Sequence, residues 1–579
     1  MLVSSSSHLL ILFLVSFAVS VSSVSVRRGT PLDITFDQSD ETPTYLWPLP
    51  AEYTSGNEAL DVDPALKLTV AGNGGGSAVL RAGFDRYRGI VFKHTGLGLG
   101  FSFMRKLRER LVSSVSAYDV DTLNITVHSD NEELQFGVDE SYTLLVPKAK
   151  DSSRVTIEAN TVYGALRGLE TFSQLCSFDY TTKKVKIYKA PWSIQDKPRF
   201  AYRGLLLDTS RHYLPITVIK QIIESMSYAK LNVLHWHIID EESFPLEVPT
   251  YPDLWKGSYT QWERYTVEDA YEIVNFAKMR GINVMAEVDV PGHAESWGAG
   301  YPDLWPSPSC REPLDVSKNF TFDVISGILT DIRTIFPFEL FHLGGDEVNT
   351  DCWRSTPHIK EWLQNHNMTA RDAYQYFVLK AQEIAVSKNW SPVNWEETFN
   401  TFPSKLHPKT IVHNWLGPGV CPKVVAKGFR CIYSNQGVWY LDHLDVPWDE
   451  VYTAEPLEGI QKASEQELVI GGEVCMWAET VDTSDVQQTI WPRAAAAAVV
   501  EISVSLFYKM KIRPLFCVCV CKERLWSQRD SSSKNVTVTA LPRLQNFRCL
   551  LNKRGVPAAP VKNFYARRAP VGPGSCYEQ

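Results

Sequence analysis

The sequence lacks any apolar run long enough to cross a bilayer, because a spanning helix needs roughly 20 residues. The apolar stretch near the N-terminus covers only Leu9–Val19. Small residues follow this run, which is typical of a secretory signal peptide. We predict a signal peptide over residues 1–25, in preference to an uncleaved signal anchor. We expect no stable membrane anchor in the rest of the chain, and a location in the secretory pathway.

An excess of positive charge is also missing, because 58 Lys and Arg stand against 66 Asp and Glu, for a net charge of −8. This balance gives no basic footprint for nucleic acid, so no nucleic-acid partner is expected. No Cys-x-x-Cys pair occurs, which argues against a structural zinc cluster. No Gly-x-Gly-x-x-Gly turn follows a predicted strand, and no Lys-Ser/Thr follows Gly74-Gly75-Gly76, so nucleotide-binding loops are not indicated.

Aromatic residues, in contrast, are abundant: 17 Trp, 24 Tyr and 26 Phe. Flat apolar faces with polar edges suit sugar rings, although most aromatic side chains belong in a core. Hydrophobic residues make up 44% of 579, which indicates a globular protein too long for one core. With a signal peptide, the Asn-x-Ser/Thr sites become predicted glycan acceptors: Asn124, Asn319, Asn367 and Asn535.

The organisation of the chain changes near residue 198. Residues 26–197 combine short alternating strands with one amphipathic helix over Thr161–Leu175, which predicts a smaller α+β domain with an antiparallel sheet. Residues 198–579 alternate apolar runs with helical patterns, which favours a (β/α)8 barrel, with a doubly wound parallel sheet as the alternative. The predicted strands are Gly204–Leu207, Asn232–Ile239, Ile282–Val288, Leu340–Leu343, Val393–Trp395, Thr410–Trp415, Arg430–Tyr433 and Leu468–Met476.

The ends of these strands carry the residues that could perform chemistry. Gly344-Gly345-Asp346-Glu347 joins a tight turn to two carboxylates, and close like charges raise one pKa and so prepare a general acid. Tryptophan follows or ends several other strands, at Trp395, Trp415 and Trp477. This pattern predicts a carboxylate glycosidase.

Two other classes fit the pattern as well. His235 and His237 alternate on one strand, so they share a face and could bind a metal, with His293 and His342 as further ligands. A metal-dependent barrel hydrolase therefore stays open, although buried, hydrogen-bonded histidines are commoner. A non-catalytic sugar binder would use the same tryptophans.

Four longer motifs narrow these alternatives: Arg203–Pro215, Val233–Ile238, Asp289–His293 and His342–Glu347. Together with Trp47–Pro50 and Tyr163–Glu170, they resemble the β-N-acetylhexosaminidases of glycoside hydrolase family twenty, most closely the plant vacuolar or lysosomal-type enzymes. The resemblance covers nearly the whole mature chain. It implies hydrolysis of terminal non-reducing N-acetyl-β-D-hexosamines, with glycan substrates such as N-glycans or chitooligosaccharides as partners. No cofactor and no metal is implied, and the family is often homodimeric. A vacuole, a lysosome-like compartment or the extracellular space is the expected location.

The resemblance also implies residue roles. The substrate's acetamido oxygen would be the nucleophile, forming an oxazolinium intermediate with retention. Glu347 would be the general acid and base, and Asp346 would orient the acetamido group. The implied sugar-binding residues are Arg203, His293, Trp395, Trp415, Tyr440, Asp442, Trp477 and Glu479.

Cysteine placement and one insertion complete the expectations. The resemblance implies disulfides Cys310–Cys352 and Cys549–Cys576; Cys421–Cys431 is a further candidate. Cys176 and Cys475, in apolar segments, are expected to be free and buried.

Residues 499–522 separate an Ala-rich helix from the segment Glu523-Arg-Leu-Trp526. In the family this segment follows the helix directly. Of the 24 separating residues, 16 are apolar. Valine codons begin with GT and a lysine codon ends with AG, so the segment has the borders of a retained intron read in frame. We predict that it is foreign to the functional enzyme, with a genuine surface loop as the alternative.

Overall fold

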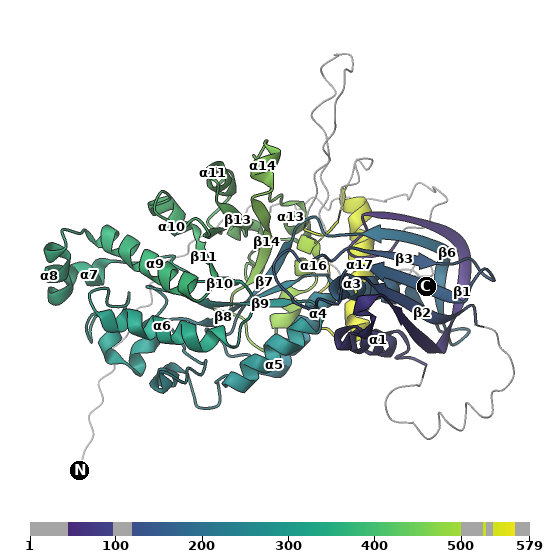
Figure 1. Cartoon of the computed structure of the whole chain (residues 1–579), viewed down its shortest axis with the longest axis horizontal. Coiled ribbons are helices and arrows are strands. Elements are labelled where there is room, and N and C mark those ends of the chain that lie inside the picture. The colour runs from purple at the N-terminus through teal and green to yellow at the C-terminus, as the bar shows by residue number, and fades with distance from the viewer. Residues whose placement is uncertain (1–43, 96–117, 499–524, 528–535, 562–579) are drawn as a thin grey trace, which may run out of the picture. The chain divides into compact units, whose positions relative to one another are not determined.

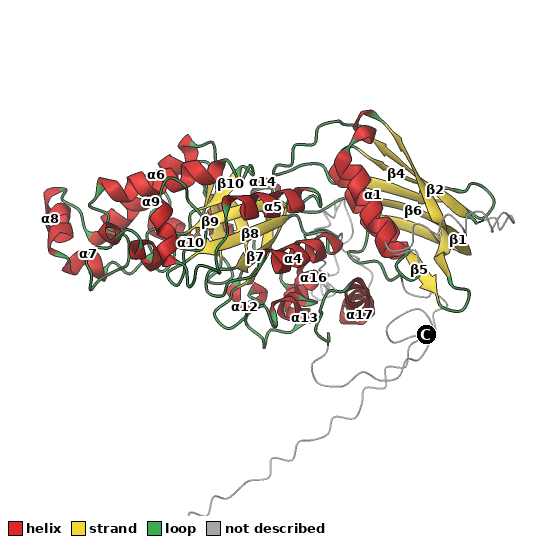
Figure 2. Cartoon of the chain, turned by 90° about the horizontal axis from the view of Figure 1, so that it is seen from below, coloured by secondary structure: helices red, strands yellow, loops and turns green. Residues whose placement is uncertain are grey.

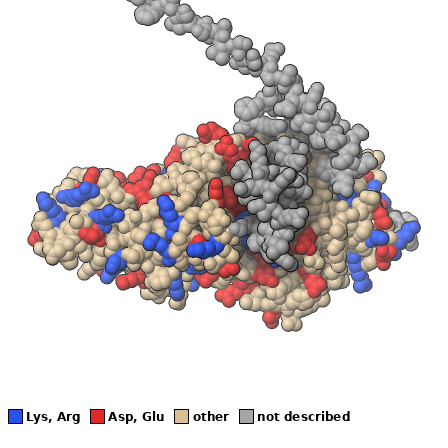
Figure 3. All heavy atoms as spheres, turned by 90° about the horizontal axis from the view of Figure 1, so that it is seen from above, with Lys and Arg blue, Asp and Glu red and all other residues tan. Residues whose placement is uncertain are grey.

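A computed structural model describes residues 44–95, 118–498, 525–527 and 536–561. The predicted signal peptide, residues 499–522, Asn535 and Cys576 lie outside these residues. No helix in the described part of the chain is long and apolar enough to cross a membrane. On the face shown in Figure 3, Lys and Arg are interspersed with Asp and Glu.

The N-terminal domain is a six-stranded sheet with helices packed against it (Figures 1 and 2). The strand order is β1-β2-β4-β3-β6-β5. The prediction of an antiparallel sheet was wrong in part, because β1 pairs with β2 in parallel, as does β2 with β4. The elements are β1 (Glu52–Ala71), η1 (Asn73–Gly76), α1 (Ala78–Val91), β2 (Val120–Val127), β3 (Tyr142–Val146), β4 (Arg154–Ala159), α3 (Val162–Leu175), β5 (Cys176–Asp179) and β6 (Lys184–Asp196).

The second domain is a closed barrel of parallel strands, as predicted. All eight predicted strands form, and the rival doubly wound sheet is excluded by the closure between β14 and β7. The strands are β7 (Tyr202–Asp208), β8 (Val233–Ile239), β9 (Asn283–Val288), β10 (Leu340–His342), β11 (Ser391–Trp395), β12 (Ile411–Asn414), β13 (Arg430–Tyr433) and β14 (Val469–Met476).

Helices follow these strands along the chain and surround the barrel (Figure 1). Their buried faces match the predicted periodicity; in α4, for example, Ile219, Ile222, Ile223 and Met226 are fully buried. The helices are α4 (Ile216–Tyr228), η2 (Pro252–Gly257), α5 (Val267–Lys278), η3 (Glu295–Ala299), η4 (Pro302–Leu304), α6 (Asn319–Arg333), α7 (Asp351–Ser355), α8 (Pro357–Asn365), α9 (Ala370–Ser387), α10 (Glu396–Thr401), α11 (Cys421–Ala426), α12 (Gln436–Trp439), α13 (Trp448–Thr453), α14 (Ala463–Gln466), α15 (Val486–Ile490), α16 (Arg493–Ala498) and α17 (Val536–Arg554).

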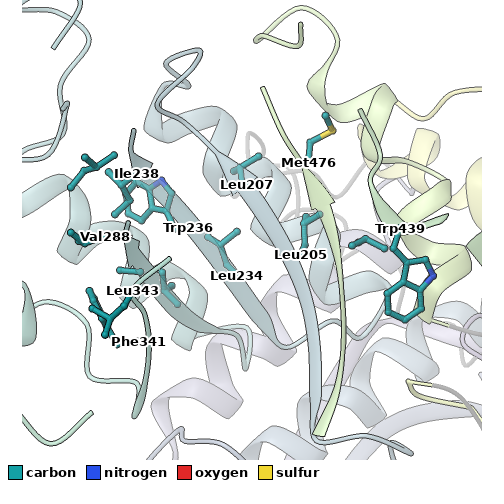
Figure 4. Close-up of a cluster of buried hydrophobic side chains, with 14 of the residues drawn as sticks. Leu205, Leu207, Leu234, Trp236, Ile238, Val288, Phe341, Leu343, Trp439 and Met476 are labelled. Carbon is teal, nitrogen blue, oxygen red and sulfur yellow. The ribbon is translucent and has the colours of Figure 1, made fainter. Parts of the chain in front are cut away.

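Strand side chains divide between two layers because successive residues point to opposite faces. Leu205 and Leu207 of β7 belong to the large cluster shared with the helices (Figure 4). Leu206 between them packs with Trp395, Tyr440, Cys475 and Trp477 in a separate cluster. The barrel thus has one apolar layer beneath its helices and a second, aromatic cluster in its interior.

The two chain segments that flank residues 499–522 meet in a helix-like contact. The Trp526 amide donates to the Ala498 carbonyl at 3.2 Å. Deleting the 24 residues would place Trp526 four positions after Ala498, which is the spacing of an α-helical hydrogen bond. Trp526 is fully buried, and its indole donates to Asp196 at 3.0 Å.

The cysteine predictions can be checked where both partners are described. Cys310–Cys352 and Cys421–Cys431 are disulfides. Cys549 is disulfide-bonded, while its expected partner lies outside the described residues. Cys475 is free and buried, whereas free Cys176 is only partly buried.

Of the predicted glycan acceptors, Asn319 and Asn367 are exposed and Asn124 lies half-buried in β2.

Candidate active site

The Asp346-Glu347 pair stands on a turn that only glycine can form. Gly344 and Gly345 have φ values of 60° and 98°, which L side chains rarely adopt. A Cβ on Gly344 would lie 1.9 Å from the Asp289 carboxyl. The Gly345 amide instead donates to Asp289 Oδ1 at 2.8 Å. Close backbone approach therefore fixes where the two carboxylates emerge after β10.

His293 connects these two carboxylates. Its Nε2 lies 3.7 Å from both Asp346 Oδ2 and Glu347 Oε2, and its Nδ1 lies 3.0 Å from Asp240 Oδ1. Burial opposes the charged ring, but Asp346 and Asp240 raise the pKa of His293 well above its usual value. His293 is therefore an imidazolium between the acid pair and Asp240.

Asp346 has a second acidic neighbour. Burial and the adjacent Asp346 raise the pKa of Asp289 well above its ordinary value. Among the described residues, Asp346 Oδ1 is buried with no hydrogen-bond partner. A buried acceptor without a partner is costly, and this one is available to a donor on a ligand.

Four predicted aromatic residues from different strand ends lie together at the site. Trp395 and Trp477 have ring centroids 6.1 Å apart, and Tyr440 lies 6.1 Å from Trp477. Trp415 and Tyr440 are nearly parallel, at 12° and 6.3 Å. Burial raises the pKa of Tyr440 well above its normal value, so its hydroxyl remains a hydrogen-bond donor.

The far side of the site carries an arginine surrounded by carboxylates. Arg211 Nη2 lies 2.8 Å from Asp240 and its Nη1 lies 3.3 Å from Asp208. The guanidinium carbon is 5.2 Å from the Trp477 ring centroid, and Glu479 is 3.9 Å from Nη1. Burial opposes the charge, but Asp208 and Asp240 raise the pKa of Arg211.

Asp442, close to Glu479, has a carboxyl that is largely withdrawn from solvent. Burial raises its pKa to about 6, with Glu479 adding to the shift. Its Oδ1 is buried and has no partner among the described residues. Asp442 and Glu479 thus offer acceptors on the predicted side of the pocket.

Arg203 is not in this site, and its predicted sugar-binding role was wrong. It lies near the start of β7 and is fully buried. Its Nη2 donates to both oxygens of Glu140 at 2.7 and 2.6 Å, and its Nε donates to the Lys230 carbonyl. Active sites of these barrels lie at the opposite, carboxyl ends of the strands, so Arg203 instead joins the barrel to the N-terminal domain.

Arg211 and Asp240 lie in the site but were not predicted from the sequence as site residues. Arg211 follows the end of β7 by three residues, within the same motif as Arg203. Because barrel active sites lie at the carboxyl ends of the strands, the position of each arginine relative to the end of β7 could have shown that Arg211, and not Arg203, belongs to the site.

His235 and His237 serve the barrel interior. His235 Nδ1 is 2.8 Å from Glu473, and His237 lies 2.6 Å from Glu287 and 2.7 Å from Asp240. The ring nitrogens of His235, His342 and His413 come within 4.8 Å of one another. However, Glu473 and Glu287 outweigh burial and raise the pKa of His235 to about 9. Burial lowers the pKa of His342 and His413. The bonds of His235 and His237 to buried carboxylates place these two histidines in a structural network.

A closed parallel barrel with a carboxylate pair, an imidazolium and an aromatic wall at its carboxyl end defines a carbohydrate-active hydrolase. The model of the glycosyl hydrolase family 20 catalytic domain matches residues 200–502, and a "beta-acetyl hexosaminidase like" model matches residues 46–175. The chain belongs to glycosyl hydrolase family 20 and is a glycoside hydrolase.

Individual relatives agree with this assignment. The chain is 68% identical to Beta-hexosaminidase 1 of Arabidopsis thaliana over 579 residues, covering 99% of this chain and 100% of the relative. It is 34% identical to Beta-hexosaminidase subunit beta of Homo sapiens, covering 90% and 89%. A solved chitobiase of Flavobacterium johnsoniae superposes with a TM-score of 0.72 at 28% identity, covering 88% of this chain and 73% of that one.

Proposed function

We propose that this glycoside hydrolase releases terminal non-reducing N-acetyl-β-D-hexosamines from glycans, with the substrate's acetamido oxygen as the nucleophile. The observation that carries the proposal is the arrangement of Asp346 and Glu347 around His293, beside an aromatic wall that suits an acetamido methyl group. Natural relatives named Beta-hexosaminidase support the substrate class.

In the first step, the acetamido oxygen attacks C1 and the glycosidic C1–O bond breaks. Glu347 gives its proton to the departing oxygen, and its side chain is 61% exposed, so a leaving group can reach it. Asp346 Oδ1 accepts from the acetamido N–H, which orients the nucleophile and balances the positive charge that develops on the oxazolinium ring. Tyr440 donates its hydroxyl to the acetamido oxygen.

In the second step, Glu347 accepts a proton from water as the water oxygen attacks C1 on the face the leaving group left. The C1–O bond of the oxazolinium ring breaks, which restores the acetamido group and retains the β configuration. Trp395, Trp415 and Trp477 enclose the acetamido methyl throughout.

The remaining groups hold the sugar's hydroxyls. Arg211 replaces Arg203 as the donor on the O3/O4 side, because a guanidinium presents paired donors to neighbouring oxygens. Asp442 and Glu479 accept from the O4 and O6 hydroxyls.

We further propose a vacuolar, lysosome-like or extracellular location and a homodimer.

Hydrolysis of a chromogenic N-acetyl-β-D-glucosaminide by the purified full chain tests the function. We expect turnover that an oxazoline-mimicking inhibitor blocks and that a chelator leaves unchanged. Loss of activity with a chelator would instead support a metal-dependent hydrolase, and sugar binding without turnover would support a non-catalytic binder.

A further inference from the structure

Two adjacent glutamates, Glu396 and Glu397, follow β11 and have no role in the chemistry above. Glu396 Oε2 accepts from the Asn414 side chain at 2.5 Å and from the Trp415 and Leu416 amides at 2.9 and 3.3 Å. Glu396 is nearly fully buried. Its carboxylate therefore fixes the backbone at the end of β12, from which Trp415 projects.

Glu397 holds the side chain of the same tryptophan. Trp415 Nε1 lies 3.0 Å from both Oε1 and Oε2 of Glu397. Trp395 and Trp477 are buried, at 1% and 9% exposure, and Trp395 Nε1 also donates to Glu287 Oε1 at 3.0 Å. Trp415 is only partly buried at the edge of their cluster. The orientation of the Trp415 ring therefore depends more on its bond to Glu397 than on packing.

Several titratable and charged groups surround Glu397. Burial raises its pKa to about 8, and Asp346 and Glu396 add to that effect. Tyr374 of α9 faces it as well, and a pocket beside it is lined by Glu347 and Arg371. This pocket gives the Glu397 carboxyl a path to exchange its proton with solvent.

We propose that Glu397 is a positioning residue that fixes the Trp415 indole and thereby sets the length of the N-acyl group the enzyme accepts. The inference rests on the proposed function, in which Trp415 encloses the acetamido methyl. When the bond to Glu397 is lost, the ring can move away from Tyr440 and leave room for a longer acyl chain.

The test compares kcat and KM for two aryl β-glucosaminides, one N-acetyl and one N-propionyl, in the full-length enzyme. A close-fitting apolar pocket discriminates one extra methylene by roughly 10- to 200-fold. We expect Glu397→Ala to raise KM for the N-acetyl substrate and to raise the propionyl-to-acetyl ratio of kcat/KM at least about threefold. Glu397→Gln retains an acceptor for the indole and should restore most of the wild-type ratio.

A double-mutant cycle with Trp415→Phe, which lacks the indole N–H, shows whether Glu397 acts through that bond. The Glu397→Ala effect on the ratio should disappear in the Trp415→Phe background. Glu361→Ala, on the exposed face of α8, is the matched control and should leave the ratio unchanged. An unchanged ratio in Glu397→Ala, or an equal effect in both backgrounds, would overturn the proposal. Failure of the wild-type enzyme to hydrolyse the N-acetyl substrate would instead refute the proposed function.

Discussion

Replacing Arg203 by Met tests whether this arginine stabilises the fold or binds substrate. The substitution removes a charge that is fully buried and leaves Glu140, which is also buried, with Arg167 Nε at 2.8 Å and Asn232 Nδ2 at 3.1 Å. Breaking a buried pair on one side costs roughly 3–5 kcal/mol, because the remaining charge stays buried.

Thermal unfolding followed by circular dichroism measures this cost. The unfolding entropy is about 2.1 cal/mol/K per residue, so a chain of 579 residues loses roughly 1 °C in Tm for each kcal/mol. Arg203→Met should therefore melt roughly 3–5 °C lower. Below the transition, kcat/KM should match the wild type, because Arg203 lies at the end of β7 opposite the site.

Two variants serve as comparisons. Arg311→Met removes a half-exposed surface pair with Glu295 and should change stability by about 1 kcal/mol or less. Arg211→Met should lower kcat/KM by at least about 10²-fold. A variant of Arg203 that melts normally but loses 10²-fold or more in kcat/KM would refute the reasoning and restore its predicted role in sugar binding.

Four further predictions concern the acid pair, Glu397 and the insertion. Glu347→Gln should reduce turnover of a natural β-glycoside by roughly 10²–10⁴-fold, and less for an activated aryl leaving group; equal turnover in steady-state assays would contradict its role. Asp346→Asn should also cripple turnover, and mass spectrometry that traps a covalent sugar on Asp346 of the wild type would exclude substrate-assisted catalysis. Between about pH 4.5 and about 8 the native state holds a proton on Glu397 that the unfolded chain lacks, so this residue makes stability fall as pH rises; urea titrations of Glu397→Gln should show a weaker fall. Deleting residues 499–522 should improve secretion, because Trp526 already bonds to Ala498 as a helical neighbour would; misfolding of the deletion variant would show that the segment is a genuine part of the protein.

The barrel could be predicted from the amino-acid sequence, because its strands and helices differ in hydrophobic period and alternate along the chain. The strand ends also predicted that Asp346, Glu347 and the tryptophans would lie at one end of the barrel, since all parallel strands of a barrel present their carboxyl ends to one face. The parallel pairing of β1 with β2 could not be predicted from the sequence. The alternation of apolar and polar residues along a strand does not depend on which strand it pairs with or on the direction of the pairing.

Residues that share one motif could be told apart only in the folded protein. Arg203 and Arg211 are eight positions apart, yet β7 carries them to opposite ends of the barrel, one bound to Glu140 and the other over Trp477. The Glu397–Trp415 bond joins the segments that follow β11 and β12, which pair side by side in the barrel. Hydrophobic period is a local property of the chain, whereas the partner of a charged side chain is set by which distant segments packing brings together.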